Sequence, residues 1–195
     1  MSVIERIPEG LDRPVRKSTT SIIIHRIKIG LVVDDVMEFF TEDPEGVATV
    51  TIGNLEDRLD AIRDWRKYGV PEKYKSRAYV PYHYIVGRKG NVYQYLPEDA
   101  KGAHCAGSNS SSVGVACFGD FRRSKPTAAQ ILKTKYLCRD LWMNHTEICG
   151  VYGHDDILAM RSKKPKQCPG PNFPVAEVHS WASTAIKNIT RDGRF

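Results

Sequence analysis

Three side chains of the types that bind metal ions stand at turns or strand ends of the sequence. His154 follows a glycine and precedes two aspartates, Cys168 lies in the turn sequence Gln-Cys-Pro-Gly, and His25 ends an isoleucine-rich run. Two imidazoles and a thiolate can hold a zinc ion and leave its fourth position open to water, which separates a hydrolytic site from a structural one. Lys166, two residues before the thiol, adds an amine to the same stretch. The combination points to a metal-dependent hydrolytic site.

Each of these residues also has an ordinary structural interpretation. A lone histidine at a strand end, such as His25, is more often held by hydrogen bonds than bound to a metal. His154 could begin a capped helix, with Asp155 or Asp156 at its N-terminus or orienting its ring. Cys168 could be a buried loop cysteine. The chain has neither the second Cys-x-x-Cys pair of a zinc ribbon or finger nor the Pro-Cys-x-x-Cys of zinc deaminases, so those classes are excluded.

Strands and helices alternate along the chain and are expected to position these residues. The isoleucine run at 21–25 predicts a buried strand, and the turn at 88–90 between two apolar runs predicts a hairpin. Thr127 is expected to cap a long helix that ends near His145, and Pro174 suits the first turn of the last helix. Further strands are predicted at 47–52, 79–86, 91–96, 113–118 and 150–152, and a further helix at 55–68. We therefore expect a single α/β domain, with a central mixed β-sheet flanked by helices and a zinc cleft at one face of the sheet.

The composition is that of an ordinary globular domain. The chain has 195 residues, of which 41% are hydrophobic and 27% are charged. No apolar stretch approaches the roughly 20 residues needed to span a bilayer, and the N-terminal stretch lacks the apolar core of a secretory signal. We therefore expect a protein that is cytoplasmic when synthesised and has no membrane partner.

Cysteine content and charge exclude little else. The five cysteines are an odd number, and without an export signal a disulfide framework is not expected. Cys117 and Cys138 are expected to be small buried hydrophobes. The net charge of +6 favours polyanions such as nucleic acid or anionic cell-wall polymer. Only the stretch 161–166 concentrates its cations, and it contains no aromatic residue, so nucleic-acid binding is a weak hypothesis.

The order of the motifs resembles the zinc-dependent N-acetylmuramoyl-L-alanine amidases of the phage-lysozyme and peptidoglycan-recognition-protein superfamily, amidase type 2. The matching features run from residue 21 to the last helix: a strand ending at His25, the hairpin sequence 82–94, Gly-Ala-His at 102–104, the segment 109–121, and the stretches Gly-His-Asp-Asp and Lys-x-Cys-Pro-Gly. On this resemblance we assign 1–19 to an irregular N-terminal arm, 20–190 to the amidase domain and 191–195 to a tail.

The resemblance implies a role for each matching residue. It implies one zinc ion per chain, held by His25, His154 and Cys168. It implies that Tyr82 and Lys166 are catalytic, Tyr82 by hydrogen bonding the attacking water or the oxyanion and Lys166 by placing positive charge on the tetrahedral intermediate. The residues expected to contact the substrate are His83, His104 and Asn109.

The activity implied is hydrolysis of the amide between the lactyl group of N-acetylmuramic acid and L-alanine. The partner is then peptidoglycan or a soluble muropeptide, and we expect a monomer. A phage or prophage endolysin that reaches the cell wall after release fits the missing signal peptide, as do a cytosolic muropeptide-recycling amidase and an injected effector. A non-catalytic peptidoglycan-binding module of the same fold is a further alternative, although members that only bind usually lack the cysteine.

Two segments depart from the family pattern. More residues separate His154 from Cys168 in the sequence than is common in the family. Most of the additional residues form the basic loop 161–164. We consider this loop a lid or a wall-binding rim, and its length leaves the placement of Lys166 open. The segment 28–53 matches no motif.

Overall fold

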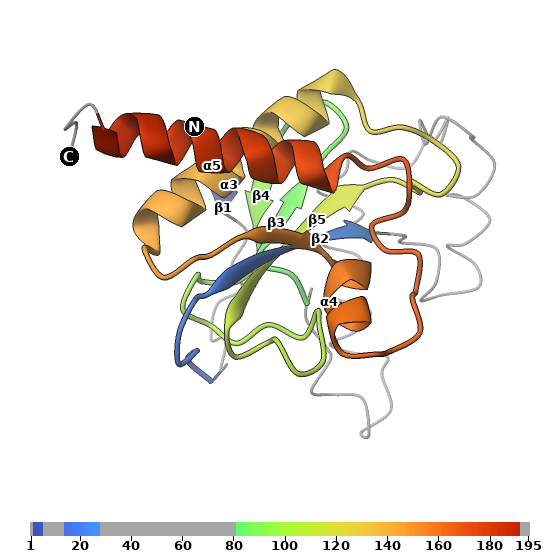
Figure 1. Cartoon of the computed structure of the whole chain (residues 1–195). Coiled ribbons are helices and arrows are strands. Elements are labelled where there is room, and N and C mark those ends of the chain that lie inside the picture. The colour runs from blue at the N-terminus through green and yellow to red at the C-terminus, as the bar shows by residue number, and fades with distance from the viewer. Residues whose placement is uncertain (1, 6–13, 28–80, 192–195) are drawn as a thin grey trace.

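The computed structural model describes residues 2–5, 14–27 and 81–191. In this part of the chain, one sheet of six strands has the order β1-β4-β3-β5-β2-β6 (Figure 1). The strands are β1 (Ile4–Glu5), β2 (Ser21–Ile27), β3 (Tyr84–Val86), β4 (Val92–Gln94), β5 (Ser112–Phe118) and β6 (Val151–Gly153). The helices are α3 (Ala128–Asn144), α4 (His154–Met160) and α5 (Val175–Arg191). The pairing of β3 with β4 is antiparallel and the other pairings are parallel, which confirms the expected mixed sheet.

The two faces of β2 serve different purposes because side chains alternate along a strand. Ile22 and Ile24 are fully buried in the main core, against α3 and α5. Ile23 belongs to a second cluster with Ile157 of α4, on the opposite face of the sheet. The two larger helices thus lie on one side of the sheet and α4 on the other (Figure 1). His25 follows the same alternation onto the α4 side.

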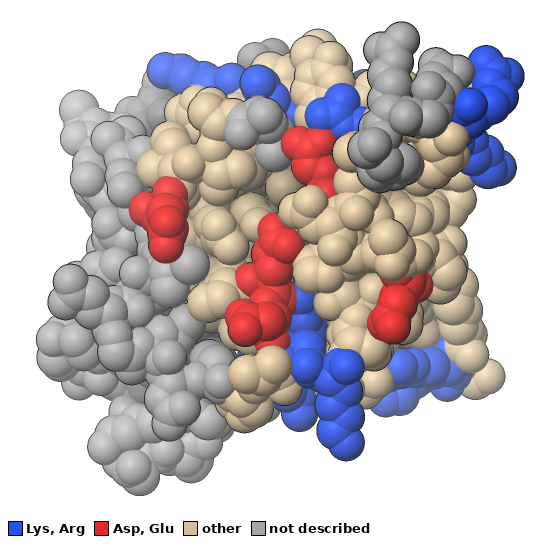
Figure 2. Space-filling view, turned by 90° about the vertical axis from the view of Figure 1, so that its left-hand side faces the viewer, with Lys and Arg blue, Asp and Glu red and all other residues tan. Residues whose placement is uncertain are grey.

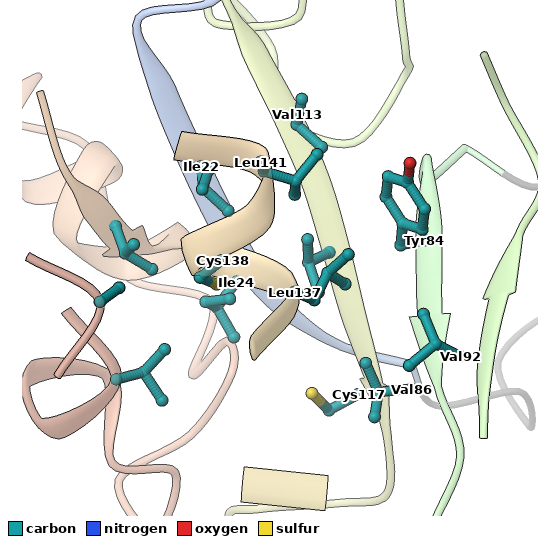
Figure 3. Packing of buried hydrophobic residues seen from close by; sticks show 14 of the residues in the cluster. Ile22, Ile24, Tyr84, Val86, Val92, Val113, Cys117, Leu137, Cys138 and Leu141 are labelled. Carbon is teal, nitrogen blue, oxygen red and sulfur yellow. The ribbon is translucent and has the colours of Figure 1, made fainter. Parts of the chain in front are cut away.

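The main core is formed by aliphatic strand residues that meet one face of α3. Leu137, Cys138 and Leu141 point from the helix toward β2 and β5, where they meet Ile22 and Val113 (Figure 3). Each fully buried aliphatic side chain contributes about 1.5–3 kcal/mol to folding. Core packing on this face therefore fixes the position of β2 in the sheet. It thereby also fixes the position of His25, whose side chain lies at the other face.

Local signals set the ends of several elements where the sequence predicts them. Thr127 caps α3 in a capping box, accepting from Gln130 N at 3.1 Å and donating its own N–H to Gln130 Oε1 at 3.1 Å. The helix ends at Asn144, as predicted. The hairpin of β3 and β4 is confirmed, and Gly90 in its turn has φ of +85°. The strands predicted at 79–86 and 91–96 are shorter in the structure, and the strand at 47–52 and the helix at 55–68 lie outside the described residues.

The N-terminal region, expected to be irregular, contains some regular pairing. β1 adds a parallel edge strand next to β4. Val15 bridges to Ala100, and Lys101 N donates to Pro14 O at 2.7 Å. These contacts fasten the loop that leads to His104. No helix in the described part of the chain combines the length and the apolar character needed to cross a membrane.

Charges of both signs are mixed over the side of the molecule that lies to the left in Figure 1. Figure 2 shows this side, with acidic groups through its middle and basic groups above and below them. The net charge of +6 therefore does not make the described part of this face uniformly basic.

Candidate metal centre

The structure brings His25, His154 and Cys168 together. Their ligand atoms all lie within 4.8 Å of one another, and all three residues are buried. The rings of His25 and His154 have centroids 4.7 Å apart, and the Nδ1 atom of His25 lies 3.7 Å from the Sγ atom of Cys168. Three residues separated by up to 143 positions thus form one cluster of two imidazoles and a thiol.

This geometry fits a zinc ion. In a tetrahedral site, bonds of about 2.3 Å to sulfur and about 2.1 Å to nitrogen hold those two atoms roughly 3.6 Å apart. The separation of 3.7 Å between His25 Nδ1 and Cys168 Sγ agrees with that value. Imidazole and thiolate are also the donors that zinc prefers in proteins. The residues present therefore suit the ion that the sequence motifs imply.

The parallel pairing of β2 with β6 explains why the two histidines meet. In this register Ile24 pairs with Gly153, the last residue of β6. His25 and His154 are the next residues along the two chain segments, so they lie side by side, with His25 still inside β2 and His154 just past the end of β6. His154 is also the first residue of α4. The capped-helix interpretation and the metal-ligand interpretation of His154 are therefore compatible.

Asp155 ties the segment that carries Cys168 to the start of α4. Its two carboxylate oxygens accept from Lys166 N at 2.8 Å and from Cys168 N at 3.1 Å. Its own N–H donates to Cys168 O at 2.9 Å. Asp156 instead accepts from Gly153 N at 2.7 Å and caps the helix. The expected alternative, in which an aspartate orients the His154 ring, is replaced by contacts to backbone amides.

His104 contacts the ring nitrogen of His25 that faces away from Cys168. The Nε2 atom of His25 lies 3.1 Å from the Nδ1 atom of His104, while its Nδ1 faces Cys168. The tautomer of His25 that carries its proton on Nε2 leaves Nδ1 without a proton and able to bind a metal. A side chain at Gly114 would come within 2.6 Å of the His104 ring, so glycine is required for this packing. His104 is 7% exposed, and its contact with His25 adds a positioning role to the expected substrate contact.

His83 has a structural role in the described part of the chain, and its expected substrate contact stays a prediction. Its side chain is fully buried. The Nε2 atom donates to Ala100 O at 2.8 Å, and the Nδ1 atom accepts from Gly114 N at 3.0 Å. Both ring nitrogens are thus engaged by the backbone on either side of the His104 loop. The ring is not accessible to a substrate in this structure.

The other predicted residues lie around the cluster. The Tyr82 ring is 5.1 Å from the His25 ring, centroid to centroid, and is half-buried. Lys166 is exposed, and its positive charge contributes to lowering the pKa of both His25 and His154. Asn109 accepts from Cys105 N at 2.7 Å and so holds the turn after His104. The catalytic roles of Tyr82 and Lys166, and the substrate contact of Asn109, stay predictions.

Burial sets the protonation of the cluster. It lowers the pKa of His25 well below 6.5, with smaller contributions from His104 and His154, and it also lowers the pKa of His154. Both imidazoles are therefore neutral at pH 7, which is the form that binds metals. Burial raises the pKa of the Cys168 thiol to about 11, against a smaller lowering by Arg26. A metal must displace the thiol proton when it binds.

Sequence reasoning missed the contacts made by Asp155. Their partners are the backbone amides of residues 11 and 13 positions away, and a backbone amide has no residue type that a motif could reveal. A carboxylate in the first turn of a helix usually indicates capping, which is the role of Asp156. The position of Asp155 in the first turn of a helix was therefore visible in the sequence, but it indicated helix capping, the commoner role.

Comparisons with known proteins identify the family. The family model for N-acetylmuramoyl-L-alanine amidase matches residues 17–171. Peptidoglycan-recognition protein SC2 of Drosophila melanogaster is 31% identical over 106 residues, which are 53% of this chain and 54% of that protein. The endolysin of Enterobacteria phage K11 is 29% identical over 136 residues, 70% of this chain and 82% of the endolysin. The chain thus spans about half the length of the first relative and most of the second.

Solved structures show the same fold. The endolysin N-acetylmuramoyl-L-alanine amidase LysCS from Clostridium intestinale has a TM-score of 0.59 at 22% identity, covering 91% of this chain and 92% of that one. Drosophila PGRP-LB has a TM-score of 0.61 at 18% identity, covering 92% and 94%. At these identities the likeness shows the fold alone. Since the family model covers most of the residues, including all three members of the metal cluster, the chain belongs to the N-acetylmuramoyl-L-alanine amidase family.

Proposed function

We propose that this protein is a zinc hydrolase that cleaves the amide between the lactyl group of N-acetylmuramic acid and L-alanine in peptidoglycan. The observation that carries the proposal is the convergence of His25, His154 and Cys168, whose ligand atoms lie within 4.8 Å of one another. Three protein ligands leave a coordination position open, as hydrolytic zinc sites do. A zinc ion held there would supply a Lewis acid that polarises the scissile carbonyl and lowers the pKa of a water molecule.

The chain's own residues would complete the site. The Tyr82 hydroxyl, on a ring beside His25, would hydrogen bond the attacking water or the developing oxyanion. The Lys166 ammonium would stabilise the negative charge of the tetrahedral intermediate. His104 would keep the His25 ring in its orientation, and Asp155 would hold Lys166 and Cys168 against His154. Each of these groups then acts on a different part of one reaction.

We further infer that the protein acts as an endolysin of the phage or prophage type. Phage endolysins are among its relatives, and one of them matches over 82% of its own length. A cytosolic enzyme that recycles soluble muropeptides would share the chemistry but not the substrate. Faster cleavage of intact sacculi than of soluble anhydromuropeptides would support the endolysin role, and the reverse order would support recycling.

Mass spectrometry of the products from purified peptidoglycan tests the reaction. The expected products are glycan strands without peptide and free peptides whose N-terminal residue is L-alanine. A chelator should abolish their formation and added zinc should restore it. Equal cleavage with and without chelator would refute the metal-dependent mechanism, and products cut at another bond would refute the assigned reaction.

A non-catalytic peptidoglycan-binding role is the second candidate. Peptidoglycan-recognition proteins are among the relatives, and one structural neighbour is a complex of two such proteins, PGRP-LCa and PGRP-LCx, with tracheal cytotoxin. Cys168 in the metal cluster favours hydrolysis over recognition alone. Zinc-loaded protein that binds cell wall but releases no peptide would favour the binding role.

A further inference from the structure

The residues from Arg161 to Gln167, here named the basic strap, connect α4 to Cys168 along the edge of the metal cluster. Both ends of the strap are fastened. Lys163 N donates to Leu158 O at 2.8 Å, at the end of α4, and Lys166 N donates to Asp155 at 2.8 Å. The strap is therefore held beside the cluster at two points of its backbone.

Arg161 fastens the strap at a third point, across the site. Its guanidinium donates to Ala106 O at 2.8 Å, to Gly107 O at 2.9 Å and to Ser108 Oγ at 2.8 Å. Gly107 has φ of +86°, and a side chain there would lie 2.0 Å from the Arg161 Nη1 atom. The guanidinium thus fits against bare backbone in the turn that follows His104. Arg161 is therefore committed to an internal contact and is not a free surface cation.

The side chains of Lys163 and Lys164 make no comparable contact with the residues that the structure describes. Lys163 and Lys164 are exposed, and neither forms an ion pair with any residue that the structure describes. Burial raises the pKa of the thiol of Cys105, the residue after His104, and the charges of Arg161, Lys166 and Lys163 lower it by smaller amounts. Three ammonium groups within four positions repel one another unless an anion lies between them. The rim of the cluster is thus a fixed, positively charged edge.

We propose that Lys163 and Lys164 bind free carboxylates on the peptide part of the substrate, so that the strap favours acidic over amidated peptides. This inference rests on the proposed function. In the bond to be cleaved, the lactyl carboxyl group is already part of the amide, and the N-acetyl sugar is neutral. The negative charges of such a substrate are therefore the carboxylates of its peptide. A cationic edge beside the cluster meets that half of the substrate.

A pair of muramyl dipeptides isolates this interaction. N-acetylmuramoyl-L-alanyl-D-glutamate and its D-isoglutamine form differ by one carboxylate, which the second has as an amide. The zinc-loaded wild type should prefer the acidic form in kcat/KM by about two- to fivefold at low salt, the range of one exposed ion pair. The double variant K163Q/K164Q should bring the ratio to about one.

Two control variants separate local charge from net charge and geometry. K125Q/K187Q removes the same charge at exposed positions outside the strap and should keep the wild-type ratio. Arg161→Lys keeps the charge but loses the planar fork that reaches both carbonyls, so it should lower the ratio by releasing the strap. A wild-type ratio of one, equal losses in the two double variants, or an unchanged ratio in Arg161→Lys would overturn the inference.

Failure of the proposed function would be recognised separately. If neither dipeptide is cleaved, the reaction assignment fails. The preference for the acidic over the amidated dipeptide is then measured as the ratio of their dissociation constants, by calorimetry. A preference for the acidic form that depends on Lys163 and Lys164 would still support the inference. Salt-sensitive attraction to anionic wall polymer, with no preference between the dipeptides, would overturn it.

Discussion

Replacing Asp155 by alanine tests how the segment that carries Cys168 is held against the start of α4, where His154 lies. The carboxylate accepts two hydrogen bonds, from Lys166 N and Cys168 N, and nothing in an alanine side chain can replace them. Hydrogen bonds to a charged group contribute about 1.5–3 kcal/mol each when buried. Asp155 is only partly buried and Lys166 is exposed, so water replaces much of the loss, and we expect about 1–2 kcal/mol for the two bonds together.

The expected loss falls on metal affinity more than on folding. Groups that orient metal ligands typically change affinity by about 10–100-fold when they are removed, which corresponds to about 1.4–2.7 kcal/mol. Asp155→Ala should weaken zinc binding by that factor. Its free energy of unfolding without metal should fall by only about 1–2 kcal/mol, because the main core lies on the other face of the sheet. Titration against a chromophoric chelator and urea unfolding would measure the two quantities.

Asp156 provides a matched control on the same helix turn. Its carboxylate accepts from Gly153 N at 2.7 Å and does not bond to the strap. Asp156→Ala should cost about 1 kcal/mol of stability through the lost cap, and zinc affinity should stay near that of the wild type. If the two variants bind zinc equally tightly, or if Asp155→Ala loses zinc only in proportion to unfolded protein, the clamping role of Asp155 is wrong.

Cys168→Ser and His154→Ala should lose zinc and activity together, which metal analysis and a cleavage assay on one preparation would check. Tyr82→Phe and Lys166→Ala should retain zinc but lose kcat by about 10²–10³-fold, and variants that lose their metal would contradict this. Because burial raises the pKa of Cys168 to about 11, zinc must displace one proton. Apparent zinc affinity should therefore rise about tenfold per pH unit from about pH 7 to 9, and a flat profile would argue against the thiol as a ligand.

Elements with strong local signals could be predicted from the sequence. The isoleucines at 22–24 indicate a buried strand because a strand covered on both faces has no need of alternating polar residues. Thr127 and Gln130 form a capping box through residue types that favour it at that spacing. These features depend on neighbours within a few positions, so a single sequence contains all of their partners.

For the site, the sequence could predict which residues belong to the metal cluster but not how the fold brings them together. Motif order indicated that His25, His154 and Cys168 belong together, but periodicity does not show that β2 pairs with β6, the pairing that makes the two histidines adjacent. The structural contacts of His83 could not be predicted for a related reason. Its two partners are backbone groups 17 and 31 positions away, and neither has a residue type that would announce the contact.

The cluster is held by two kinds of constraint that differ in strength. His25 lies on a central strand whose neighbours Ile22 and Ile24 are fully buried, so moving it would require moving the core, and a one-residue slip of β2 would turn it to the wrong face. Cys168 depends on Asp155 and on the strap, whose residues are exposed. We therefore expect local opening to begin at the strap and not at the strand, since local opening costs less than global unfolding. Asp155 and Arg161 join the strap to the rest of the protein. We therefore expect these two residues to affect how long a metal stays bound, although neither is a ligand.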